Sequence, residues 1–227
     1  MHAELTLDLK RTAFLIIDLQ EDQRSDPLCV AADLDKVLDR SATLLRAARE
    51  NGVPVFHAAF VRDFNLRPPR PFEPLAEDGG PAFSRSGSPL VAICHEVAPI
   101  DGEVVLYKND ASAFEEGSLQ QRLEALGIEW LVIAGVWTEA CIAASVRDAM
   151  AGGFRVVIVK DACTSGTAAM HQTGILNLAN RLYGGAIADT ARTETLFKGG
   201  SASVWRNSRP VPFRFTLEDA SALYAGL

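Results

Sequence analysis

Three polar residues stand where apolar segments end, and together they could carry out nucleophilic chemistry. Asp18 closes "AFLIID", Lys108 closes "VVLYK", and Cys141 lies just after "WLVIAGV", where an alanine-rich helix is expected to begin. In open parallel sheets, functional groups gather outside the carboxyl ends of the strands. We therefore expect these three side chains, which are far apart in the sequence, to meet in space.

A carboxylate, an ammonium group and a thiol form a set that needs no histidine. An ionised aspartate can accept the proton of a thiol, and a lysine cation stabilises the resulting thiolate. The first turn of a helix also favours a thiolate, because its unpaired N–H groups and the helix dipole present positive charge. Both effects are expected to lower the pKa of Cys141 from its ordinary value of about 8.5.

The other potential nucleophiles and bases fit less well. Cys29, Cys94 and Cys163 are widely separated, form no C-x-x-C pair, and are expected to be reduced structural thiols. None of the four histidines offers a Cys-His motif of the papain or caspase kind.

The segments that must position the three residues alternate between strand and helix patterns. Six short, continuous apolar runs are typical of strands that are buried on both faces of a parallel sheet. Helical periodicity lies between them, and βαβα order predicts right-handed crossovers. We therefore predict an α/β fold, a doubly wound Rossmann-like three-layer sandwich with a six-stranded parallel sheet. The expected strands are 13–19, 53–60, 103–108, 130–136, 155–162 and 186–190, and the expected helices are 33–50, 117–126, 139–151 and 167–183.

Two segments do not follow this alternation. Residues 61–102 form a proline-rich connection that is too long for an ordinary loop, and such segments are usually lids or contacts. Residues 199–227 carry Trp205, Phe213, Phe215 and Tyr224. We expect residues 1–198 to form one domain, and 199–227 to form a C-terminal extension that packs on this domain or on a neighbouring subunit.

Charge and hydropathy argue against two classes of partner. The formal net charge of −7 is unfavourable for binding nucleic acid or an anionic membrane. The first apolar run spans only residues 13–17 before Asp18 ends it, which is too short for a signal peptide or a membrane span. A cytoplasmic location is therefore expected.

Three motifs in order resemble one family, the isochorismatase-like cysteine hydrolases, which include nicotinamidases, N-carbamoylsarcosine amidases, ureidoacrylate hydrolases and biuret hydrolases. "LIIDLQ" (15–20) resembles the Asp-x-Gln motif of the first strand, "KNDASAF" (108–114) resembles K-x-x-x-S-A-F, and "GVWTEAC" (135–141) resembles G-V-x-T-x-x-C. The order and spacing fit over roughly residues 11–197.

The resemblance implies a role for each member of the set. Asp18 would be the general base, Lys108 the cationic partner and Cys141 the nucleophile. It also implies a cis peptide bond between Val136 and Trp137, with the N–H groups of Trp137 and Cys141 forming an oxyanion hole. Dimers or tetramers are expected from the family as well, so a homodimer or homotetramer is predicted.

Other candidate residues are weaker. Gln20 and Phe114 belong to the matching motifs, and Phe83 and Arg85 lie in the long connection; all four are candidates for substrate contact. Nicotinamidases of this family bind a metal through an Asp-x-His segment after the second strand, whereas this chain has "FHAAFVRDF" there. We therefore expect no catalytic metal and no cofactor.

The leading hypothesis is an amidohydrolase that cleaves the C–N bond of a small amide or ureido compound through an acyl-enzyme thioester. One alternative is vinyl-ether hydrolysis of the isochorismatase type, in which an aspartic acid protonates the substrate and no thiol is needed. The other is a non-catalytic binding or scaffold protein on the same fold, since fold does not dictate function.

Overall fold

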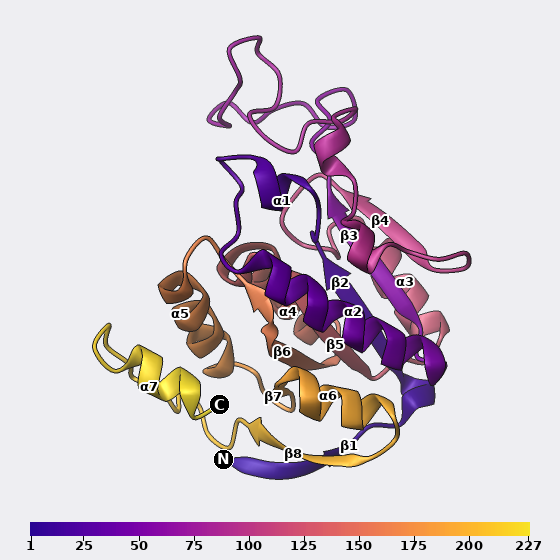
Figure 1. The fold of residues 1–227 in the computed structure, drawn as a ribbon, viewed down its shortest axis with the longest axis vertical. Helices are drawn as coiled ribbons and strands as arrows, with labels where there is room; N and C mark the ends of the chain where they lie inside the picture. Colours follow the sequence, from indigo (N-terminus) through magenta and orange to yellow (C-terminus); the bar gives the residue numbers. More distant parts are fainter.

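A mixed sheet of eight strands forms the middle layer of the protein (Figure 1). The computed structural model describes residues 1–227. The strands follow one another across the sheet in the order β1-β8-β7-β6-β5-β2-β3-β4. Their bounds are β1 (His2–Thr6), β2 (Thr12–Ile17), β3 (Val55–Phe60), β4 (Val104–Lys108), β5 (Trp130–Val136), β6 (Arg155–Thr164), β7 (Ala186–Ala188) and β8 (Ser201–Arg206).

The α/β class predicted from the sequence is confirmed, but the six-stranded parallel sheet is corrected to a mixed sheet of eight. Neighbouring strands from β7 to β4 run parallel, whereas β8 pairs antiparallel with both β7 and β1. Exposed and buried residues alternate along much of the two additional strands, β1 and β8. They therefore lack the continuous apolar run that marks a strand covered on both faces.

Helices cover both faces of the sheet and bury two separate apolar clusters (Figure 1). One face is covered by α2 (Leu34–Glu50) and α6 (Thr190–Phe197), and the other by α3 (Ser118–Ala125), α4 (Ala143–Ala151), α5 (Ala168–Ala179) and α7 (Ala220–Ala225). The sequence patterns anticipated α2 to α5, but not α6 or the short α1 (Asp22–Ser25). Single 3₁₀ turns lie at Leu9–Arg11, Pro89–Val91 and His95–Val97. No helix is both long enough and apolar enough to span a membrane.

The C-terminal segment packs against the chain's own domain. Its first part is strand β8, and the ring of Trp205 lies 5.4 Å from that of Phe213. The side-chain amide of Asn180, at the end of α5, exchanges two 2.9 Å hydrogen bonds with the backbone of Phe213. Trp205 is buried, and Phe213, Phe215 and Tyr224 are partly buried against the same chain, so the segment itself supplies no argument for assembly. The homodimer or homotetramer stays a prediction.

Gly135 allows β5 to pass unusually close to β2. A Cβ atom at this position would lie 2.0 Å from the carbonyl oxygen of Ile17, and the φ angle of +128° is one that L residues rarely adopt. The close approach occurs where β2 and β5 end, directly before Asp18 and the Val136–Trp137 segment. Gly135 is therefore required for the strand ends to meet.

Gly135→Ala is expected to lower the free energy of unfolding by about 3 kcal/mol or more, because it combines backbone strain with overpacking. Denaturant unfolding measures the loss. Gly127→Ala is the matched control: Gly127 also has a positive φ of +65°, but a Cβ atom added there would meet nothing within 4 Å. Gly127→Ala is expected to lower the free energy of unfolding by about 1 kcal/mol. Equal losses in the two variants would show that the contact with Ile17 does not matter.

Candidate active site

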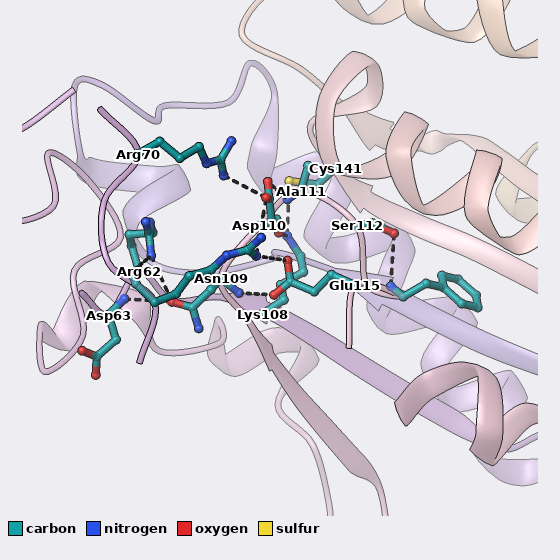
Figure 2. Close-up of polar contacts among 12 residues, drawn as sticks. Arg62, Asp63, Arg70, Lys108, Asn109, Asp110, Ala111, Ser112, Glu115 and Cys141 are labelled. Carbon is teal, nitrogen blue, oxygen red and sulfur yellow. Dashed lines mark hydrogen bonds and ion pairs between the residues drawn. The ribbon is translucent and has the colours of Figure 1, made fainter. Parts of the chain in front are cut away.

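The carboxyl ends of β2, β4 and β5 bring Asp18, Lys108 and Cys141 together. The Nζ atom of Lys108 lies 2.9 Å from Oδ2 of Asp18 and donates a hydrogen bond of 3.3 Å to Sγ of Cys141. Figure 2 shows the lysine directed toward the sulfur. The lysine cation therefore bridges a carboxylate and a thiol.

Asp18 occupies a sharp bend at the end of β2. Its φ angle is +54°, a left-handed conformation that aspartate tolerates better than most residues. Its backbone N–H donates to the carbonyl of Ala58 at 2.9 Å, which continues the pairing of β2 with β3. The side chain is buried, and its second oxygen, Oδ1, has no hydrogen-bond partner. That oxygen is therefore a buried acceptor without a hydrogen-bond partner in the chain.

Lys108 is the last residue of β4 and is almost completely buried. Besides Asp18 and Cys141, its ammonium group donates to the carbonyl of Asp110 at 3.1 Å. It also lies 4.9 Å from the centre of the Phe60 ring, where a cation–π interaction adds to its stabilisation. All three donors of the ammonium group can thus find an acceptor.

Cys141 lies in a π-helical turn, Thr138–Ile142, which leads into α4. The peptide bond between Val136 and Trp137 is cis. The carbonyl of Trp137 accepts hydrogen bonds from the N–H groups of Ala140 and Ile142, whereas the N–H of Trp137 itself donates no hydrogen bond. The N–H of Trp137 is therefore an unpaired donor that lies close to Cys141 in the sequence.

The pKa of Cys141 is shifted opposite to the direction predicted from the sequence. Burial raises the pKa of this thiol, and the charge of Asp18 raises it further, while Lys108 opposes the rise. Burial also raises the pKa of Asp18, against the lowering effect of Lys108. Desolvation lowers the pKa of Lys108, but its contacts with Asp18 and Cys141 outweigh this effect, and the pKa is raised. The sequence expectation counted the lysine and the helix start, but burial and the neighbouring carboxylate dominate.

A cavity of about 440 Å³ opens onto Asp18 and Cys141. This volume is within the range of small-molecule sites. The cavity has apolar walls and several polar groups. The walls include Leu28, Phe60, Phe72, Pro74, Phe83 and Trp137, and the polar groups include Gln23, Arg62, Arg70, Glu73, Ser84, Asn109 and Asp110.

The four weaker sequence candidates divide into one that lines this cavity and three that do not. Phe83 lines it and stacks on Phe60, with ring centres 6.0 Å apart. Gln20 is wholly buried outside the lining, where its amide bonds the backbone of Phe60 and Val91.

The other two are also held elsewhere. Phe114 packs in the core against Phe154, and Arg85 forms an exposed ion pair with Asp78. Gln20 thus supports the end of β3, and Phe114 belongs to the core, and neither contacts the cavity.

Sequence reasoning missed several residues of the cavity. Arg62 lies just after the end of β3, and Lys108 lies at the end of the neighbouring strand β4. This shared position at a strand end could have marked Arg62 as a candidate. Gln23 and Arg70 lie in α1 and in the long connection. No periodicity marks such residues, because loop conformation decides where they point.

Polar contacts hold the Trp137 ring as one wall of the cavity. Its Nε1–H donates to Oε1 of Gln23 at 2.7 Å, and Gln23 donates to Asp22 at 3.1 Å. Asp22 accepts a second hydrogen bond, of 2.5 Å, from Ser84. Burial raises the pKa of Asp22. The tryptophan ring is therefore fixed by a buried chain of side chains from α1 and the long connection.

A second buried network, with residues from α5 and α7, supports the π-helical turn that carries Cys141. Nδ1 of His171 on α5 lies 2.7 Å from the hydroxyl of Thr138, and its Nε2 lies 3.0 Å from the hydroxyl of Tyr224 on α7. The Thr138 hydroxyl donates to the carbonyl of Thr164 at 3.0 Å. The last helix is thereby linked to the first residue of the turn that carries Cys141.

One group of potential metal ligands lies outside the cavity. Ligand atoms of Glu21, Cys94 and Glu96 are within 4.8 Å of one another. Arg24 forms ion pairs with both carboxylates, at 3.4 Å and 2.6 Å. A cationic side chain already neutralises this group.

Comparison with known proteins identifies relatives for most of the chain. Residues 12–192 match the Isochorismatase domain. The chain is 32% identical over 188 residues to maleamate amidohydrolase from Pseudomonas putida, covering 78% of this chain and 83% of that protein. It is 28% identical over 155 residues to N-carbamoylsarcosine amidase from Arthrobacter, covering 65% of this chain and 57% of that protein.

Solved structures share the fold. A cysteine hydrolase from Pseudomonas syringae matches with a TM-score of 0.73 and 18% identity, over 86% of this chain and 95% of that one. An isochorismatase family protein from Desulfovibrio vulgaris matches with a TM-score of 0.70 and 25% identity, over 83% and 98% of the two chains.

The network around His171 predicts a pH dependence of stability. Burial lowers the pKa of His171 to about 4, from an ordinary value of 6.5. Between these two values the unfolded chain binds a proton that the folded protein does not, so stability falls as the pH drops. This residue should account for a loss of about 2 kcal/mol between pH 7 and pH 5.

Urea unfolding of the protein and of His171→Gln at both pH values measures this contribution. The variant should lose about 2 kcal/mol less than the wild type over that interval. His95→Gln, which removes an exposed histidine, is measured alongside as the control for loss of an imidazole. Identical pH dependence in His171→Gln and wild type would contradict the prediction.

Proposed function

The chain belongs to the isochorismatase family of hydrolases, and on that premise we propose that it is an amidohydrolase acting on a small amide or ureido compound. The observation that carries the proposal is the contact of Lys108 with both Asp18 and Cys141 at one end of a ligand-sized cavity. Relatives named as amidohydrolase and amidase support cleavage of a C–N bond.

In the first half of the reaction, Sγ of Cys141 attacks the carbonyl carbon and Asp18 takes the thiol proton. Asp18 then transfers this proton to the leaving nitrogen, the C–N bond breaks, and ammonia or an amine departs from a thioester. The raised pKa of Cys141 supports a thiol that keeps its proton until attack, and the raised pKa of Asp18 supports a stronger base.

In the second half, Asp18 takes a proton from water as the oxygen adds to the thioester carbonyl. The C–S bond then breaks, the acid is released, and Asp18 returns the proton to the sulfur. Lys108 stabilises the negative charge that alternates between Asp18 and Cys141. The unpaired N–H of Trp137, together with that of Cys141, is proposed to bind the developing oxyanion.

A second candidate function is supported by the burial of Asp18. A carboxyl group with a raised pKa can also act as an acid, which is what protonation of a vinyl ether requires. Such a reaction would not need the thiol of Cys141. The two functions therefore differ in their dependence on this residue.

Cys141→Ala is expected to abolish turnover of small amides and carbamoyl compounds, with a loss of at least about 10³-fold, because no acyl-enzyme can form. Mass spectrometry of quenched reactions should detect an acylated Cys141 in the wild type and none in the variant. Cys163→Ala removes a buried core thiol and serves as the control that should retain activity. Full activity in Cys141→Ala would end the proposal.

Asp18→Asn and Cys141→Ser, assayed on the same compounds and on isochorismate, distinguish the two candidate functions. Amide hydrolysis should be lost in both variants, because base and nucleophile are each required. Turnover of isochorismate that is lost in Asp18→Asn but retained in Cys141→Ser would favour the vinyl-ether reaction. Absence of turnover on every compound, with no adduct at Cys141, would favour a non-catalytic protein.

A further inference from the structure

We propose that the cavity selects uncharged amides with a bulky apolar or aromatic acyl group, and that Asp110 is a specificity-determining residue that excludes carboxylate-bearing substrates. This inference rests on the proposed function and names a substrate class for it. It is carried by two observations: every cation at the cavity already has an anionic partner, and most of the walls are apolar.

The first cation, Arg62, is fully engaged by the protein. Its guanidinium group is buried and donates to both oxygens of Glu73, at 2.5 Å and 2.7 Å. It also donates to the backbone carbonyls of Arg67 at 2.8 Å and Pro68 at 3.3 Å. A ligand carboxylate could bind Arg62 only by displacing the bidentate carboxylate of Glu73, whose side chain is only 16% exposed, and this is unfavourable.

The second cation, Arg70, is more accessible but is also neutralised. Its guanidinium group donates to Oδ2 of Asp110 at 2.8 Å, as Figure 2 shows. The other oxygen of Asp110 accepts the N–H of Ala111 at 2.9 Å, which fixes the carboxylate at the cavity. A substrate carboxylate near Arg70 would therefore lie beside a fixed negative charge, and like charges at such distances repel.

The third cation, Lys108, is neutralised by Asp18 as described above. The cavity therefore offers no free positive charge to an anionic acyl group. Recognition of a carboxylate in proteins ordinarily depends on an available arginine or lysine. The charge pattern thus disfavours an acidic substrate although two arginines line the site.

The walls favour an apolar ring. Phe60 and Phe83 stack with ring planes 25° apart, and both line the cavity. Trp137 lines it with a ring that Gln23 holds in place, and Phe72 also lines it, with 81% of its surface exposed. Aromatic rings pack favourably against such faces, and burial of apolar surface supplies the binding free energy.

The test compares benzamide with 4-carbamoylbenzoate, which differ by one carboxylate. Wild-type protein should hydrolyse benzamide with a kcat/KM at least about tenfold higher. Asp110→Asn preserves the size of the side chain but removes the carboxylate closest to Arg70, which leaves only Glu73 at 4.0 Å, and should shift the ratio toward 4-carbamoylbenzoate by at least about tenfold. Asp78→Asn is the matched control, because Asp78 pairs with Arg85 outside the cavity, and it should leave the ratio unchanged.

Binding is measured separately, by calorimetry on the Cys141→Ala protein and on Cys141→Ala combined with Asp110→Asn. The same selectivity and the same shift are expected, since binding does not require the nucleophile. Preference of the wild type for 4-carbamoylbenzoate, an unchanged ratio in Asp110→Asn, or binding of neither compound would overturn the inference. Selective binding of benzamide without hydrolysis by the wild type would retain the inference about the cavity and contradict the proposed amidohydrolase function.

Discussion

The buried ion pair between Lys108 and Asp18 is the interaction on which the rest of the site depends. Both side chains are almost fully removed from water, and burying an unpaired charge would cost several kcal/mol. The pair is tolerated because β2 and β4 end at the same edge of the sheet and place the charged atoms 2.9 Å apart. The carbonyl of Asp110 and the thiol of Cys141 provide the remaining acceptors of the ammonium group. Loss of either charge would leave the other buried alone.

The same principle of paired charges extends outward from this centre. Arg62 with Glu73, and Arg70 with Asp110, continue the pattern around the cavity. The cysteine turn is held from two sides, by Gln23 through the Trp137 ring and by His171 through Thr138. Fixed partners of this kind keep reactive groups in position without reorganisation during a reaction. Most charged and polar side chains of the site therefore already have a partner within the protein, and few are available to a ligand.

Much of the fold could be predicted because its central strands follow a simple physical rule. Every residue of β2 and of β5 is buried, so both read as continuous apolar runs. The strands β1 and β8 could not be recognised in the same way, because one face of each meets solvent over much of its length. The sequence left open whether Trp205 and Phe213 pack on the same chain or on a neighbouring subunit, since aromatic residues in a sequence do not reveal which surface covers them.

The sequence by itself determined which three polar residues meet at one edge of the sheet, because Asp18, Lys108 and Cys141 each stand where a parallel strand ends or a helix begins. Only the tertiary structure decided in which direction the pKa of each of these groups is shifted. Burial of Cys141 beside Asp18 raises its pKa, whereas the lysine and the helix start alone had predicted a decrease. The tertiary structure also decided which loop residues reach the cavity, with Phe83, Arg62 and Arg70 inside and Arg85 outside. Desolvation and loop conformation both depend on contacts between distant segments, and no local pattern of residues encodes them.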